Sequence, residues 1–150
     1  MKKLLAKIYQ LSYPLALAYW FIFRPHTEGV RCIIRSDDQI LLIKHTYGPD
    51  LYTVPGGGIH KNESKEDAVR REIREEVRLQ VTDLKLLTRN LYTKEYKKDT
   101  VHLFTATTDT ANITIDQSEL KEAAWFPIQK LPENIYPNLK KHLHALLKSE

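Results

Sequence analysis

The sequence predicts an α/β fold in which a mixed β-sheet carries helices on both faces. Two observations lead to this prediction. β-rich apolar runs occur both before and after a single charged helix that starts at Ser64, and a second amphipathic helix is expected over residues 135–147. A crossover helix and a closing helix of this kind imply a layered arrangement around one sheet. The length of 150 residues is that of one domain with a buried core.

Residues 1–24 are predicted to form an apolar helical leader ahead of the main domain. Apolar residues recur at helical spacing at Leu4, Ile8, Leu11 and Leu15. Pro14 then kinks or ends that helix, and the apolar run over 15–23 is too short to cross a bilayer. We expect the leader to pack on the domain or on a second subunit, as in a homodimer. A signal peptide and peripheral membrane contact through residues 1–24 are the alternatives.

The main domain, residues 25–150, opens with a predicted β-hairpin. Its two β-rich runs, 30–34 and 40–43, are separated by a polar turn. A short strand is predicted at 51–54, before a proline and three glycines that form a sharply bent loop. Further strands are predicted after the charged helix at 84–87, 90–93, 101–107 and 123–126.

The charged helix gathers acidic residues on one side. Ser64 and Asp67 form a start that is similar to a capping box. Its apolar stripe consists of Ala68, Val69, Ile73 and Val77. Glu72 and Glu76 project from nearly the same face, with Glu75 beside them. Because like charges at this spacing destabilise a helix by roughly 0.2–0.5 kcal/mol per pair, a hard divalent cation among the oxygens best explains the cluster.

Composition indicates a globular protein of the reducing cytoplasm. A hydrophobic content of 42% and a charged content of 28% exclude a disordered chain. The single cysteine, Cys32, excludes an internal disulfide framework, and its apolar neighbours predict a buried, inert thiol. A net charge of +4 favours anionic small molecules, whereas nucleic acid would need a basic stripe. The dense basic segment 94–98 carries its own acid and is expected to be a solvated loop or the end of a hairpin, with the steering of phosphates as the alternative, so no nucleic-acid partner is predicted.

The segment from Gly57 to Leu79 resembles the Nudix box, G-x5-E-x7-R-E-U-x-E-E-x-G-U, where U is a bulky aliphatic residue. The residues in register are Gly57, Glu63, Arg71, Glu72, Ile73, Glu75, Glu76 and Leu79. Arg78 departs from the pattern, because it stands where the box has a glycine that would suit a left-handed helix cap. An arginine there costs about 1 kcal/mol, or the helix ends differently. The similarity of layout extends from about Gly29 to the C-terminus.

This resemblance implies a Nudix α/β/α sandwich and a metal-dependent pyrophosphohydrolase. Its substrate would be a nucleoside diphosphate linked to a group X, and its cofactor Mg²⁺ or Mn²⁺, which polarises phosphate oxygens and lowers the pKa of bound water. The expected metal ligands are the carbonyl of Gly56 and the carboxylates of Glu72, Glu75 and Glu76. The expected catalytic set is Glu72, Glu75, Arg71 and Glu63, in which Arg71 orients the carboxylates and Glu63 fastens the loop to the helix.

Substrate contacts are expected near the first hairpin. The candidates are Arg31, Arg35 and His45, although such residues are also common on solvated surfaces. Glu119 is a further candidate for a metal ligand or base. The alternative function is a catalytically silent, nucleotide-binding regulatory module; such modules usually lose box glutamates, and none is missing here. Nucleoside triphosphates, oxidised nucleotides, ADP-sugars and dinucleotide polyphosphates are all compatible with the pattern.

Overall fold

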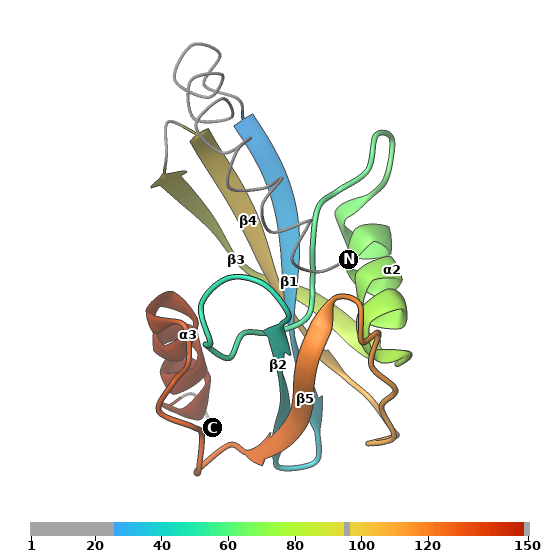
Figure 1. Ribbon diagram of the computed structural model, residues 1–150, viewed down its shortest axis with the longest axis vertical. Helices are drawn as coiled ribbons and strands as arrows, with labels where there is room; N and C mark the ends of the chain where they lie inside the picture. Colours follow the sequence, from blue (N-terminus) through green and yellow to red (C-terminus); the bar gives the residue numbers. More distant parts are fainter. Residues whose placement is uncertain (1–25, 95–96, 149–150) are drawn as a thin grey trace.

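The computed structural model describes residues 26–94 and 97–148, which form one five-stranded sheet between two helices (Figure 1). The strands are β1 (His26–Ser36), β2 (Gln39–His45), β3 (Thr82–Lys94), β4 (Lys97–Thr107) and β5 (Leu120–Pro127). The helices are α2 (Lys65–Val77) and α3 (Pro137–Lys148). The predicted α/β architecture with helices on both faces is confirmed. The predicted leader, residues 1–24, lies outside the described residues.

The sheet is mixed, with strand order β3-β4-β1-β2-β5. β1 runs parallel to β4, from the pair His26 and Lys98 to the pair Arg35 and Thr107. β1 with β2, β2 with β5, and β3 with β4 are antiparallel. β1 is therefore the central strand, and most of its ladder hydrogen bonds reach a segment that comes much later in the chain.

The glycine loop, which we define as residues 55–59, occupies the other edge of β1. The N–H of Val30 donates to the carbonyl of Gly57, and the N–H of Cys32 donates to the carbonyl of Pro55, each over 2.9 Å. In return, the N–H of Ile59 donates to the carbonyl of Glu28 over 3.3 Å. The loop is thus anchored to the sheet by backbone hydrogen bonds before the chain enters α2, as the trace beside β1 shows (Figure 1).

Two apolar cores form because side chains alternate along each strand. On β1, Val30, Cys32 and Ile34 belong to the core beneath α2, whereas Ile33 belongs to the core beneath α3. The α2 core includes the predicted stripe Ala68, Val69, Ile73 and Val77. The α3 core includes Leu42, Tyr52, Leu103, Leu139 and Leu143. These cores fix the two faces on which the functional groups lie.

Three of the predicted strands differ from those observed. The short strand expected at 51–54 is reduced to isolated bridges, Ile43 with Thr53 and Tyr52 with Ile135. Its two sides pair with different partners, so no continuous ladder forms. The separate strands expected at 84–87 and 90–93 are one strand, β3, which continues through register shifts near its start and between Leu86 and Thr88. Such bulges let a ladder absorb extra residues without ending.

The ends of α2 follow the sequence pattern closely. At its start, the hydroxyl oxygen of Ser64 accepts a hydrogen bond from the N–H of Asp67 over 3.1 Å. At its end, Arg78 has φ 59° and ψ 29°, and its N–H donates to the carbonyl of Arg74 over 3.2 Å. The helix therefore ends in the left-handed cap that a glycine would favour, with an arginine in that conformation. No helix in 26–94 and 97–148 is long and apolar enough to cross a membrane.

Candidate functional site

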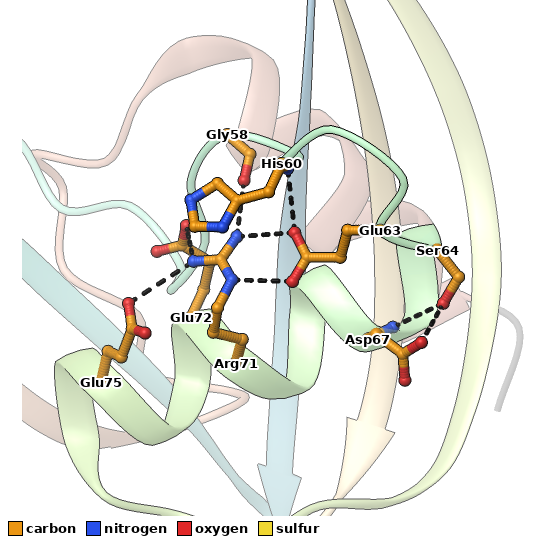
Figure 2. A network of polar contacts seen from close by, with 8 residues as sticks. All are labelled: Gly58, His60, Glu63, Ser64, Asp67, Arg71, Glu72 and Glu75. Atoms are coloured by element: carbon orange, nitrogen blue, oxygen red, sulfur yellow. Dashed lines mark hydrogen bonds and ion pairs between the residues drawn. The ribbon is translucent and has the colours of Figure 1, made fainter.

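Arg71 is the centre of a hydrogen-bond network that joins α2 to the segment ahead of it (Figure 2). Its guanidinium grips Glu63 in a bidentate pair, with Nε to Oε1 at 2.7 Å and Nη2 to Oε2 at 2.9 Å. Nη2 also donates to the carbonyl of Gly58 over 2.8 Å, and Nη1 donates to Glu72 over 2.7 Å. Glu75 lies further off, at 3.4 Å. The side chain of Arg71 thus connects Gly58 and Glu63, which precede α2, with the acids Glu72 and Glu75 of that helix.

The Arg71–Glu63 pair is charged under all ordinary conditions. The hydrogen bond from Arg71, together with the N–H of His60 at 2.9 Å, lowers the pKa of Glu63 to about 2. The same carboxylate raises the pKa of Arg71 above its usual value. Both side chains are largely shielded from water, so this pair is a permanent fastener between the loop and the helix.

Glu76 is the buried acid of the site, with only 2% of its surface exposed. One of its oxygens accepts a hydrogen bond of 2.9 Å from the N–H of Gly56. Burial raises the pKa of Glu76 to about 7, while the Gly56 hydrogen bond and the charge of Arg31 oppose that rise, and the charges of Glu72 and Glu119 add to it. Such a pKa is typical of groups that take part in chemistry near neutral pH.

The glycines of the loop allow the acids to approach the backbone. A Cβ on Gly57 would lie 2.5 Å from a carboxylate oxygen of Glu72. Gly56 has φ 142°, and a Cβ there would lie 2.2 Å from the carbonyl oxygen of Val30. Gly58, by contrast, has open space around it. Gly56 therefore fits the sheet only as glycine, and Gly57 makes room for Glu72.

The carbonyl of Gly56, an expected metal ligand, accepts a hydrogen bond from the guanidinium of Arg31. Across residues 26–94 and 97–148, no three His, Cys, Asp or Glu side chains converge as a ready metal cluster. The acids are instead held singly, Glu72 by Arg71 and Glu76 by Gly56. The donors are nonetheless all hard oxygens, and the space at Gly57 cradles one carboxylate, so the residues fit Mg²⁺ or Mn²⁺ in chemistry.

A cavity of about 790 Å³ opens beside Arg31, on the α3 face of the sheet. It is lined by Arg31, His45, Tyr47, Gly48, Thr53, Val54, Asn90, Asp99, Val101, Leu103, Tyr136, Asn138, Leu139 and His142. Two of the three predicted substrate residues, Arg31 and His45, are in this lining. Arg35 is not in it, because it lies four residues further along β1, roughly 13 Å away at the rise of a strand.

The loop after β2 brings aromatic groups to the mouth of this cavity. The rings of His45 and Tyr47 stack with their centroids 5.2 Å apart. Burial and the charge of Arg31 lower the pKa of His45, so it is neutral at pH 7. Burial raises the pKa of Tyr47, and the charge of Glu119 adds to that rise, as it does for Glu76. Glu119 is exposed, and its backbone carbonyl accepts a hydrogen bond of 2.8 Å from Thr46. It therefore lies in the neighbourhood of the acids.

Several cavity residues carried no signal in the sequence. Asn90, Asp99, Asn138 and His142 come from β3, β4 and α3, and no spacing along the chain connects them. They become neighbours only through the strand register and the packing of α3. Tyr47 lies between the predicted strands 40–43 and 51–54, in a segment for which no function is predicted.

The described site can be compared with known proteins. Residues 25–146 match the family model described as the NUDIX domain. Over 113 residues, the chain is 36% identical to proteins named NAD-capped RNA hydrolase NudC from Shigella dysenteriae and Escherichia coli. That alignment covers 73% of this chain but 43% of each relative. The chain therefore matches less than half the length of these relatives.

Solved structures show the same fold. The MutT NUDIX hydrolase from Burkholderia pseudomallei has a TM-score of 0.72 and 23% identity, with coverage of 79% of this chain and 96% of that protein. A NUDIX family hydrolase from Clostridium perfringens has a TM-score of 0.71 and 24% identity, with coverage of 83% and 98%. At these identities the likeness concerns the fold.

Proposed function

The chain belongs to the Nudix family of hydrolases, and from this premise we propose that it cleaves the diphosphate bond of a nucleoside diphosphate linked to a second group, using Mg²⁺ or Mn²⁺. One observation carries the proposal. Glu72 and Glu76 of α2 meet the glycine loop at Gly57 and Gly56, beside an arginine at the mouth of a cavity. Arg31 is the link between the two parts, because it lines the cavity and also contacts the carbonyl of Gly56, so a phosphate chain that reached the acids would pass this arginine.

The metal would be held by this chain's own oxygens. Glu72, Glu76 and the carbonyl of Gly56 are the proposed ligands, and Glu75 is a fourth. When bound, a divalent cation would polarise the phosphate oxygens and offset their charge. The carbonyl of Gly56 becomes available when Arg31 moves from it, and the planar guanidinium then suits a phosphate group. Arg31 would therefore exchange its hydrogen bond to the carbonyl of Gly56 for a contact with a phosphate of the substrate.

Glu75 is the acid that can reach solvent water. Its side chain is 57% exposed, against 13% for Glu72. We assign it the role of orienting the attacking water and accepting its proton. Arg71 and Glu63 support this arrangement by holding the acids and the loop in place. Arg71 neutralises part of the acidic charge, which lowers the mutual repulsion of Glu72 and Glu75.

The test is a hydrolysis screen with and without Mg²⁺ or Mn²⁺. The panel contains nucleoside triphosphates, an oxidised nucleotide, ADP-sugars and dinucleotide polyphosphates. It also contains NAD-capped RNA, because the relatives from Shigella and E. coli are named for that substrate. Glu76→Gln should abolish turnover of any active substrate, with circular dichroism and the melting temperature showing that the fold is kept.

A matched control separates this effect from a general loss of charge on α2. Glu66 lies in the first turn of α2 and is exposed, so Glu66→Gln should keep full turnover. Full activity in Glu76→Gln, or equal losses in both variants, would refute the assignment.

The regulatory module remains the second candidate, and the contact between Arg31 and the carbonyl of Gly56 favours it, because that contact occupies an expected metal ligand. It predicts nucleotide binding without release of phosphate or nucleoside monophosphate under any metal. Metal-dependent product release from one member of the panel would exclude it.

The remaining expectations are proposals for the whole chain. We place it in the cytoplasm and give residues 1–24 a packing role on the domain or on a second copy. Sedimentation with anionic vesicles, compared with a chain that starts near Arg24, tests membrane contact. Size-exclusion chromatography with light scattering on the same pair tests whether the leader makes a homodimer.

A further inference from the structure

The cavity on the α3 face has opposite charges at its two ends. Arg31 on β1 is paired in register with Leu103 on β4, and Asp99 lies four residues from Leu103 along the same strand. At a rise of about 3.3 Å per residue, this offset is roughly 13 Å. Side chains two and four residues apart share a face of a strand, so both charged groups line the same cavity. Arg31 marks the end next to the acids, and Asp99 marks the far end.

Hydrogen-bonding groups line the cavity between Arg31 and this acid, because Asn90 is paired in register with Val101, which lies two residues from both Leu103 and Asp99 along β4. Asn90 of β3 and His142 of α3 lie 3.3 Å apart, Nδ2 to Nε2, and Asn138 stands one turn earlier on α3. Asp99 accepts a hydrogen bond from the hydroxyl of Thr27 through Oδ1. A carboxylate has capacity for further donors on its second oxygen. Among the described residues that line the cavity, Arg31 is the one lysine or arginine.

These charges would orient a nucleotide that enters the cavity. Phosphates are drawn to Arg31 and repelled by Asp99, so the far end takes the uncharged part of the ligand. That part must donate hydrogen bonds, because a carboxylate can only accept them. Tyr136, which lines the cavity two residues before Asn138, offers an aromatic face on which a planar ring can stack, whereas Tyr47 lies toward Arg31 and the acids.

We propose that this far end is a subsite for a nucleobase with an amino group at purine C6 or pyrimidine C4, as in adenine or cytosine but not in guanine, and that Asp99 and Asn90 read that group. Acidic side chains accept from the amino group of cytosine, and asparagine pairs with the amino edge of adenine, in protein–nucleic acid contacts. Hypoxanthine and uracil present a carbonyl oxygen at the same place, which the carboxylate repels. The proposal rests on the proposed function, since it assigns the nucleoside of that substrate.

The test measures binding separately from turnover. Calorimetry in EDTA compares ADP with IDP, and CDP with UDP, which differ only at the amino position within each pair. The amino base should bind roughly 10-fold tighter or better, as a hydrogen bond to a charged group implies. With metal present, ADP-ribose and IDP-ribose should differ in KM by a similar factor at equal kcat.

Variants locate the effect. Asp99→Asn should bring the two members of each pair to within about 2-fold, because an amide can turn its NH₂ toward a carbonyl. Thr27→Val removes the hydroxyl that Asp99 accepts while keeping the carboxylate, so it should retain the preference. Asp109→Asn is the matched control, since Asp109 is exposed and outside the cavity lining. Asn90→Ala should weaken the binding of ADP and CDP selectively. This variant tests the subsite if Asp99→Asn does not fold.

Equal affinity for both members of each pair in the unmodified chain would overturn the subsite. Asp99→Asn and Asn90→Ala variants that both keep the full preference would overturn it as well. Selective binding without any hydrolysis would instead support the subsite and overturn the proposed hydrolase. Hydrolysis without any preference between the bases would support the proposed hydrolase and overturn the subsite.

Discussion

The carboxylate of Glu76 accepts a 2.9 Å hydrogen bond from the backbone N–H of Gly56, which lies twenty residues earlier in the chain. This bond sets the distance between the fourth box glutamate and the loop whose carbonyl faces Arg31. Because Glu76 is buried, any movement of the loop would leave a buried acid without its donor, which is costly. The helix and the loop therefore move as one unit.

A methyl group on Gly57 should disturb catalysis without unfolding the protein. Its Cβ would meet the carboxylate of Glu72 at 2.5 Å, and the end of a glutamate can move away at little cost in stability. Displacing a catalytic acid by about 1 Å can lower the rate by roughly 100-fold. Gly57→Ala should therefore reduce kcat by roughly 10- to 100-fold with a nearly unchanged melting temperature. A methyl group on Gly58 meets open space, so Gly58→Ala should keep both the kcat and the melting temperature of the unmodified chain. Equal kcat values for the two variants would show that the contact between residue 57 and Glu72 does not affect catalysis.

Arg78→Gly should stabilise the fold. Arg78 holds φ 59° at the end of α2, a conformation that costs a residue with a Cβ roughly 1–2 kcal/mol. Part of this gain is offset by the greater freedom of glycine in the unfolded chain. We expect a net increase of about 0.5–1 kcal/mol in the free energy of unfolding, measured with urea. Arg74 is also exposed but lies inside the helix, so Arg74→Gly should instead lower the free energy of unfolding by about 1 kcal/mol.

The Glu63–Arg71 pair should make stability depend on pH at the acid end. The folded protein lowers the pKa of Glu63 from 4.5 to about 2, so the unfolded chain binds its proton first as the pH falls. Stability from this pair is fully present above pH 4.5 and is lost between pH 4.5 and 2. Glu63→Gln should lower the melting temperature at pH 7, and the gap to the unmodified chain should shrink by pH 3. A gap that stays constant would show that the charge of Glu63 contributes nothing.

Cys32 should resist alkylation while the protein is folded. The thiol is 0% exposed, and burial raises its pKa to about 12. At pH 8 the reactive thiolate is then roughly one part in ten thousand. Iodoacetamide should leave the native protein unmodified by mass spectrometry for hours, and modify it once in 6 M guanidinium. Rapid labelling of native protein would mean that β1 separates from its neighbours.

The sequence predicted those features that depend on local spacing. The cap at Ser64 and the apolar stripe of α2 both concern residues within one or two helical turns of one another, whereas the left-handed end at Arg78 was one of two outcomes that the sequence left open. The approach of the loop to the helix also followed from the box, in which Gly57 and Glu72 stand at fixed positions. Short-range patterns of this kind specify structure before any tertiary contact forms.

Long-range features were not predictable in this way. Asn90, Asp99 and His142 become neighbours only because β3 and β4 pair in one particular register and α3 packs across them. The bulge beyond Leu86 shifts that register, and no turn residue marks it. For Arg35, the pattern predicts a position near the first hairpin but not the end of the strand at which the cavity lies. The pattern of residues along a strand predicts on which face of the sheet a residue lies, but not which residues are its neighbours on the adjacent strands.

The parallel pairing of β1 with β4 has a consequence for synthesis of the chain. Thr27 and Asp99, which pair across these strands, are 72 residues apart. During translation, β1 and the glycine loop are synthesised long before β4. The backbone groups along one edge of β1, the central strand of the sheet, therefore stay without their hydrogen-bond partners until β4 is available. Contacts of such separation are slow to form, and an unpaired strand edge invites association with other chains. Ribosomes stalled before and after residue 107 should therefore carry nascent chains that differ sharply in protease resistance and in their demand for chaperones.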